Sequence, residues 1–205
     1  MAWCYREAMN QTKLPAKLAD RKTNKARKRE AKKREIAESA INALKIYGYA
    51  RTTLRDIAAQ TQMPLSSLHY YFEDKDGLLI FCVRRYKFKF IELIERAVSG
   101  IEDPSDFADA FCESLAQTVL DDAELHRLWY DIRNQAMFDE TFAPVVEEIE
   151  ALLINTLAPI ADDLETRQRI FVRLDGAFRF ALQQYLSGRD QSLSNLKKLM
   201  IDTAF

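Results

Sequence analysis

The sequence has few of the residues that interrupt helices and few that cross-link a small fold. Its 205 residues include only five glycines, five prolines and three cysteines. Such sparse turn residues argue against all-β and collagen-like folds, which need them frequently. Cys4, Cys82 and Cys112 are far apart, and no pair has metal-ligand or redox-motif spacing, so we expect reduced thiols. A redox-sensing role for Cys82 or Cys112 stays an alternative.

The sequence also lacks the patterns of metal sites and of membrane segments. The two histidines, His69 and His126, are too dispersed to build a zinc site with these cysteines, and no cofactor is expected. The longest apolar run, 78–83, is far shorter than the ~20 residues that span a bilayer. The N-terminus has no apolar run of signal-peptide length. The sequence therefore predicts a cytoplasmic protein without a membrane partner.

A strong net charge is absent, yet the charge is unevenly divided. The formal net charge is −1. Residues 1–90 hold 20 Lys and Arg against 9 Asp and Glu, a net charge of +11, whereas residues 91–205 hold 10 against 22, a net charge of −12. Only the first part has the electrostatic character that suits a nucleic acid.

The hydrophobic pattern is helical throughout. Residues 1–23 are polar, contain Pro15 and predict a flexible arm. A basic helix follows from Asn24 to Gly48, and two short helices over 54–60 and 65–72 have the dimensions of a helix-turn-helix. Longer helices are expected at 75–98, 105–120, 122–138, 143–158, 163–187 and 192–204. The fold class is therefore all-α, with about nine helices.

Three segments of this region carry a family resemblance. The runs 48–58, 63–72 and 74–79 contain Thr52-Thr53, Ile57-Ala58, Tyr71-Phe72 and Asp74-Lys75 followed by Leu78-Leu79. With this spacing, residues 25–80 resemble the DNA-binding domain of the TetR family of bacterial transcriptional regulators. The sequence departs from the family pattern at Gln62, where Gly is usual, and at Pro64, where a Ser cap is usual.

The resemblance implies a recognition helix over 65–72, in which Leu68 and Phe72 face inward. The physical chemistry of the outward residues agrees, because small and polar side chains read base edges while hydroxyls and cations hold phosphates. The candidate DNA contacts are Thr53, Arg55, Leu65, Ser66, Ser67, His69, Tyr70, Tyr71 and Lys75. The basic run 21–34 adds a sequence-independent attraction. For each, a structural or solvated role is the alternative.

In the TetR family, the helices after the DNA-binding domain dimerise and bind a small effector. The wide apolar stripe of 163–187 and the last helix predict a dimer interface of Phe171, Leu174, Phe178, Leu182, Tyr185, Leu196 and Met200, with the intrachain core as alternative. Candidate ligand-binding residues are Phe107, Phe111, Trp129, Tyr130, Arg133, Phe138 and Phe178. A partly buried Arg133 needs an anion, either an internal carboxylate such as Asp175 or an acidic ligand.

These inferences give a domain plan and a function. We expect a flexible arm at 1–23, a helix-turn-helix domain at 24–74 and an effector-binding and dimerisation domain at 75–205. The function indicated is a homodimeric repressor that leaves a palindromic operator when it binds a small apolar or amphipathic ligand. The alternatives are a DNA-binding scaffold without effector and an all-α enzyme. The acidic clusters at 121–124 and 162–165, which suggest metal-binding carboxylates, lie at predicted helix ends, where acids normally cap, so no catalytic or metal-binding residue is assigned.

Overall fold

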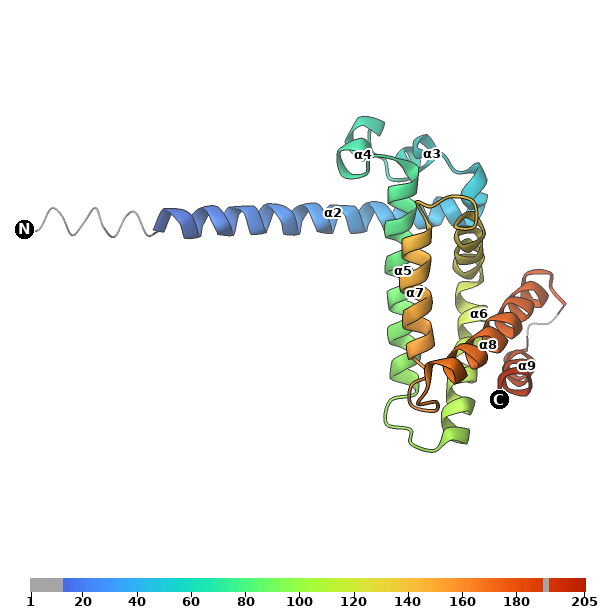
Figure 1. The fold of residues 1–205 in the computed structure, drawn as a ribbon. Coiled ribbons are helices and arrows are strands. Elements are labelled where there is room, and N and C mark those ends of the chain that lie inside the picture. The colour runs from blue at the N-terminus through green and yellow to red at the C-terminus, as the bar shows by residue number, and fades with distance from the viewer. Residues whose placement is uncertain (1–12, 190–191) are drawn as a thin grey trace, which may run out of the picture.

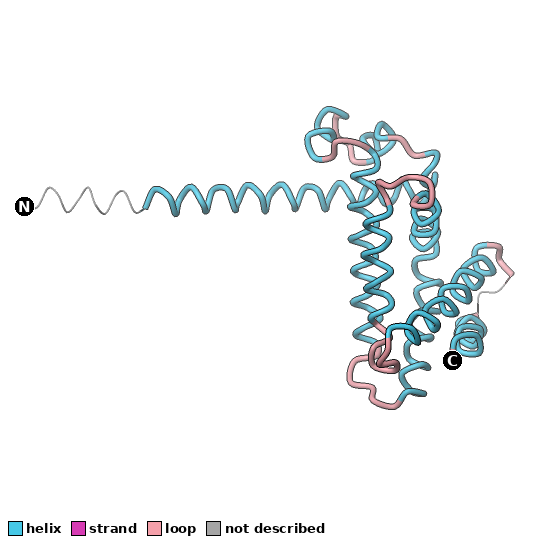
Figure 2. Tube along the Cα trace, viewed as in Figure 1, coloured by secondary structure: helices cyan, strands magenta, loops and turns pink. Residues whose placement is uncertain are grey.

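The computed structural model describes residues 13–189 and 192–205, and every regular element in those ranges is an α-helix (Figures 1 and 2). The helices are α2 (Lys13–Arg51), α3 (Leu54–Gln60), α4 (Leu65–Tyr71), α5 (Lys75–Ala97), α6 (Pro104–Gln135), α7 (Ala143–Asn155), α8 (Leu164–Leu186) and α9 (Leu193–Ala204). In the described ranges, no helix combines the length and apolar character needed to cross a membrane.

Eight helices are described rather than the nine expected, because two expected helices are continuous. The break expected at Asp121 and Asp122 is a local deflection inside α6, where Asp122 has φ −134° and ψ 29°. The expected start at Asn24 is also wrong, because α2 already begins at Lys13. Pro15 lies in the first turn, where its missing N–H leaves no hydrogen bond unmade. Residues 13–23 are thus helical and not a loose arm, while residues 1–12 lie outside the described residues.

The long helix α2 has two parts with different surroundings. Its second part carries the stripe that includes Ile36, Ala40 and Leu44, which are at most 1% exposed. Its first part projects from the body as a rod, on the side away from α8 and α9 (Figure 1). The helical conformation is interrupted at Gly48, whose φ of +73° lies in the left-handed region that glycine adopts without strain. This confirms the expected glycine cap.

Two cores share α5. Ile36 and Ala40 of α2 pack with Ile57 of α3, Leu68 of α4, and Leu78 and Cys82 of α5 in the N-terminal core. Further along, Phe90, Ile91 and Ile94 of α5 pack with residues of α6, α8 and α9 in the C-terminal core. The transition between the two cores therefore lies within α5, after the boundary at 74 and 75 that the sequence suggested.

A third cluster joins the two cores. Leu44 of α2 packs with Leu79 and Val83 of α5, Leu128 of α6 and Phe142 before α7. The guanidinium of Arg127 on α6 also donates to the backbone carbonyl of Lys45 on α2, with an N–O distance of 2.8 Å. Because α6 continues into the C-terminal core, it connects the N-terminal helices directly to the rest of the molecule.

Candidate DNA-binding interface and ligand cavity

The start of α3 is fixed by a reciprocal cap. The hydroxyl of Thr53 accepts from the backbone N–H of Asp56, and the Asp56 carboxylate accepts from the backbone N–H and hydroxyl of Thr53. These hydrogen bonds from Thr53 hold the pKa of Asp56 below its usual range. The expected Thr-x-x-acid helix start is therefore present, and the Thr53 hydroxyl is already engaged before any phosphate arrives.

The turn between α3 and α4 is strained at one residue. Gln62 has φ +53°, a left-handed conformation that costs a residue with a Cβ about 1–2 kcal/mol. Pro64 is the N-cap of α4, one position before the first helical residue, and it offers no side-chain cap. The two departures from the family pattern therefore leave the turn formed, at a cost in conformational energy and in capping.

The helix α4 presents a polar surface, as expected. Leu68 and Phe72 are buried at 0% and 4% exposure and hold the helix to the N-terminal core. Arg55 of α3 and Ser66, His69 and Tyr70 of α4 are exposed, whereas Leu65, Ser67, Tyr71 and Lys75 are partly buried. Leu65 and Tyr71 pack against the N-terminal core, so both have a structural role there.

The basic part of α2 reaches α4. The guanidinium of Arg29 lies 5.7 Å from the Tyr70 ring centroid and donates to the Tyr70 carbonyl oxygen at 3.4 Å. The ammonium of Lys33 lies 5.0 Å from the centroid of the Phe72 ring. Among the described side chains, Lys25, Arg27 and Lys28 form no ion pair. The surface around α4 and the first part of α2 is therefore rich in cations, and no carboxylate of the described residues pairs with Lys25, Arg27 or Lys28.

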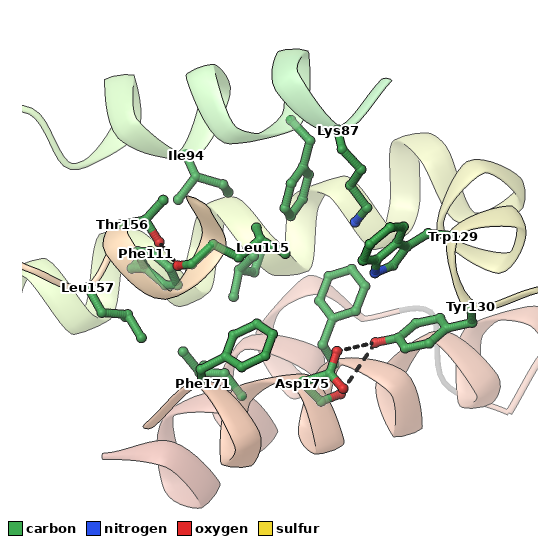
Figure 3. A pocket seen from close by; sticks show the side chains of 14 residues that line it. Lys87, Ile94, Phe111, Leu115, Trp129, Tyr130, Thr156, Leu157, Phe171 and Asp175 are labelled. Carbon is green, nitrogen blue, oxygen red and sulfur yellow. Dashed lines mark hydrogen bonds between the residues drawn. The ribbon is translucent and has the colours of Figure 1, made fainter. Parts of the chain in front are cut away.

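The C-terminal helices line a mostly apolar cavity of about 60 Å³ that is partly open to the outside (Figure 3). Phe111, Trp129 and Tyr130 of α6 and Phe178 of α8 line it, as the sequence predicted. The sequence reasoning missed further lining residues on α5 and α8, most of all Lys87, Phe90, Phe171 and Asp175. Lys87 could have been noticed because it interrupts the apolar stripe of Val83, Phe90 and Ile94 on α5.

Three of the candidate ligand-binding residues do not line this cavity. Phe107 lies behind Phe111, with the two rings stacked at a centroid distance of 5.6 Å. Phe138 is 87% exposed, because α6 ends at Gln135 and the residue follows in a turn. Arg133 donates to both oxygens of Asp175 at 2.8 Å, and its guanidinium lies 2.7 Å from Glu150. The internal carboxylate is thus the partner of Arg133, one of the two alternatives considered.

Most polar groups of the cavity wall are already engaged. The hydroxyl of Tyr130 donates to the Asp175 carboxylate at 3.0 Å, and that of Thr156 donates to the Leu153 carbonyl oxygen at 2.6 Å. Burial, followed by the charge of Asp175, raises the pKa of Tyr130. Lys87 differs from these groups, because its ammonium faces aromatic rings.

The residues expected to form a dimer interface are mostly inside the protomer. Leu174, Phe178, Leu182, Leu196 and Met200 are at most 6% exposed and belong to the C-terminal core. Phe171 and Tyr185 pack against that core, and the Tyr185 hydroxyl donates to the carbonyl oxygen of Leu120. For the five buried residues, the structure therefore agrees with the alternative of an intrachain core, because the widest stripe of α8 covers α6 and α9 of its own chain.

The remaining sequence candidates carry little chemistry. Cys82 and Cys112 are free and buried, and burial raises the pKa of each thiol to about 12, so neither is suited to sense redox state through a thiolate. Cys4 lies outside the described residues. Among the described side chains, no three histidine, cysteine or acidic residues gather as a metal site would require.

Comparisons with known proteins agree with this geometry. The family model described as bacterial regulatory proteins of the tetR family matches residues 34–80. Over 59 residues, the chain is 37% identical to an uncharacterized HTH-type transcriptional regulator in the dhlA 5′ region of Xanthobacter autotrophicus, and the match spans 29% of each protein.

Solved structures extend the likeness in fold along most of the chain. The multidrug binding protein EbrR, complexed with imidazole, is 22% identical with a TM-score of 0.67, and the alignment covers 84% of this chain and 94% of that one. A TetR family member from Streptomyces coelicolor, SCO1917, is 22% identical with a TM-score of 0.68, covering 84% and 97%. Residues 34–80 therefore form a DNA-binding domain of the tetR family of bacterial regulatory proteins, and the solved structures extend the likeness in fold to the helices that follow it.

Proposed function

We propose that the chain is a homodimeric repressor that binds a palindromic operator and leaves it when a small ligand fills the cavity. The observation that carries this proposal is the placement of four consecutive residues of α6. Arg127 and Leu128 contact α2 through the carbonyl oxygen of Lys45 and the side chain of Leu44. The next two residues, Trp129 and Tyr130, line the cavity. A shift of α6 on ligand binding therefore moves the base of the N-terminal helices as well.

The DNA-binding surface is proposed to consist of α4, the start of α3 and the projecting part of α2. Ser66, His69 and Tyr70 are exposed on α4 and are proposed to face the major groove. Arg55 and Lys75 are proposed to hold phosphates, and the basic part of α2 adds cations along the flanking duplex. The net charge of +11 over residues 1–90 supports this orientation.

The partner surface is proposed to be the outer face of α8, with a second copy of the chain as its occupant. Val172 and Phe180 are 68% and 51% exposed, eight residues apart on one side of the helix. Gly176 lies between them, and a Cβ built there would meet nothing within 4 Å. Among the described residues, no contact inside the protomer requires a glycine here, although glycine destabilises a helix by about 1 kcal/mol relative to alanine. A helix of a second copy could approach closely at this point, which would explain the glycine. Two copies of α4 related by a twofold axis would read a palindrome.

The first experiment tests DNA recognition. The purified protein selects sites from a random-sequence duplex pool, and the enriched site is then titrated by fluorescence anisotropy at rising salt. We expect an inverted repeat with half-site centres about 34–36 Å apart and an affinity that falls steeply with salt. Enrichment of no sequence, or of a single half-site, would contradict the dimeric repressor.

Matched variants then separate the two kinds of contact. Lys75→Ala should weaken binding to all sequences about equally, whereas Tyr70→Ala, at a residue proposed to face the major groove, should change the preferred sequence. A DNA-binding scaffold without effector would show the same sequence preference and the same effects of the two variants. No small ligand would release that scaffold from the DNA. Identical behaviour of the two variants would show that α4 is not the recognition helix.

The second experiment tests self-association by sedimentation velocity. Phe180→Glu should produce monomers, because it places charge at the centre of the proposed interface. Phe138→Glu, at a position that is also exposed, is the control and should leave the dimer intact. A dimer that survives Phe180→Glu would place the interface elsewhere.

A further inference from the structure

Lys87 is an unpaired cation inside the ligand cavity. Lys87 lies near the middle of α5 and is 2% exposed. The ammonium lies 4.4 Å from the ring centroid of Phe90, 4.9 Å from that of Trp129 and 5.4 Å from that of Tyr86. Among the described residues, no carboxylate lies within 4 Å of it. Figure 3 shows Lys87 entering from α5, on the side of the cavity opposite to Asp175.

A lysine in this position needs an explanation. Aromatic faces attract a cation, but an ammonium taken out of water without an anionic partner is costly. Burial lowers the pKa of Lys87 to about 7, although the charge of Asp175 partly offsets this effect. Asp175 itself is held by Arg133 and Tyr130 on the far wall. When Lys87 is protonated, the cavity therefore contains one positive charge that no carboxylate of the described residues pairs with.

We infer that the cavity binds a small, apolar monoanion whose head group meets the Lys87 ammonium. This inference rests on the proposed effector site and specifies the chemical class of its ligand. Among the described residues that line the cavity, Lys87 and Asp175 carry charge, and Asp175 already pairs with Arg133. A ligand with one negative charge would therefore balance the charge of Lys87. The remaining wall is made of rings and aliphatic chains, including Phe111, Phe171 and Phe178, which suit an aromatic or short aliphatic body. A carboxylate joined to such a body meets both demands.

The inferred ion pair makes binding dependent on pH. The titratable and charged groups around Lys87 are Tyr86 on α5, His126, Tyr130 and Arg133 on α6, Glu150 beyond Arg133 on α7, and Asp175 on α8. Burial, and then the charge of Lys87, keeps the pKa of His126 well below its usual range. Burial also raises the pKa of Tyr86 and of Tyr130. The pKa of Lys87, at about 7, places its own change of charge between pH 6 and 8.

The sign of the pH effect follows from this assignment. An anion binds the protonated Lys87, so above pH 7 each complex must take up a proton. The affinity for a carboxylate should therefore fall about tenfold between pH 6 and pH 8. The affinity for the neutral amide of the same acid should not change over that range.

The test uses Trp129 as its reporter. The chain has two tryptophans, so Trp3→Phe leaves Trp129, in the cavity wall, as the single emitter. The probes are benzoate, phenylacetate, hexanoate and octanoate, each compared with its own amide in the absence of DNA. We expect at least one acid to bind at pH 6 at least tenfold more tightly than its amide. Equal affinities within every pair, or no binding by any of the probes, would overturn the inference.

Variants of the lysine assign the preference to its charge. Lys87→Met should reduce the preference for the acid to about twofold or less, and its fold is checked by circular dichroism and thermal unfolding. Lys87→Arg should retain the preference, and Lys89→Met, an exposed lysine on the same helix, should behave like the parent protein. A preference for acids that persists in Lys87→Met would overturn the inference.

The outcome is separable from that of the proposed function. If acids bind through Lys87 but do not release operator DNA, the repressor mechanism fails while the ligand assignment stands. If amides bind as well as acids and do release DNA, the repressor mechanism stands while the ligand assignment fails.

Discussion

Replacing Lys87 with methionine should change how the stability of the empty protein depends on pH. The pKa of Lys87 is 10.5 in the unfolded chain and about 7 in the folded protein, because burial disfavours the ammonium. Between these values the unfolded chain binds more protons than the folded protein. The folded state therefore becomes more stable as pH rises from 7 toward 10.5, and this contribution disappears when Lys87 becomes methionine.

The size of the effect follows from the two pKa values. Between pH 7 and pH 8.5, Lys87 should add about 1.5 kcal/mol to the free energy of unfolding, at 1.36 kcal/mol for each pK unit. This interval stays below the range in which the buried thiols of Cys82 and Cys112, with pKa values near 12, lose their protons in the folded protein. Lys87→Met should also be the more stable protein at pH 7, because a thioether chain suits the aromatic surroundings.

The assay is urea unfolding of both proteins, followed by circular dichroism at pH 7 and 8.5. At each pH, the free energy of unfolding of Lys87→Met is subtracted from that of the parent protein, which cancels the titration of groups that the two proteins share. The quantity of interest is how much this difference changes between pH 7 and pH 8.5. Lys89→Met, whose parent side chain is exposed, should give no such change. A difference between the parent protein and Lys87→Met that is the same at both pH values would show that the Lys87 ammonium is not desolvated.

Three further outcomes test other parts of the structure. Gln62→Gly should raise the free energy of unfolding by about 0.5–1 kcal/mol in urea melts, since glycine relieves the left-handed strain at φ +53°; a destabilised variant would contradict that strain. Asp175→Asn should lower the free energy of unfolding by about 1–3 kcal/mol, because Arg133 loses a partly buried partner. Glu148→Gln, at an exposed ion pair, should lower it by less than about 1 kcal/mol. Equal losses in the two variants would refute the distinction between the two ion pairs. Gly176→Leu should leave the fold intact in circular dichroism but weaken self-association at least tenfold in sedimentation, and an unchanged dimer would show that helices do not meet there.

The sequence was most informative where local rules decide the structure. The cap at Thr53, the stop at Gly48 and the inward anchors Leu68 and Phe72 follow from hydrogen bonding and periodicity within a few residues, and all are present. The all-α class follows from the same rules. The pairing of Arg133 with Asp175 was one of two alternatives, and the structure supports it because a buried guanidinium requires an anion nearby.

The errors arose where packing between distant segments decides. Helical periodicity places Leu182 and Phe180 on different faces of α8, but it does not show which face covers the protomer's own core and which is left outside. Lys87 is marked in the sequence only by its place in the apolar stripe of α5, and its burial depends on the folding of α6 and α8 over that helix. The continuity of α6 through Asp122 likewise depends on neighbours that hold both halves in place.

The projecting part of α2 has a consequence for how closely neighbouring proteins can sit on a chromosome. Residues 13–28, which precede the contacts of Arg29 and Lys33 with α4, form about 24 Å of rod at 1.5 Å per residue, or about two thirds of a turn of the duplex. The rod leaves the body on the side away from α8, so a dimer formed through α8 would carry one rod at each outer end. Each bound dimer would then occupy about two thirds of a helical turn of DNA beyond either half-site. Adjacent operators, or a polymerase start site, would have to lie farther apart than the recognition helices alone require.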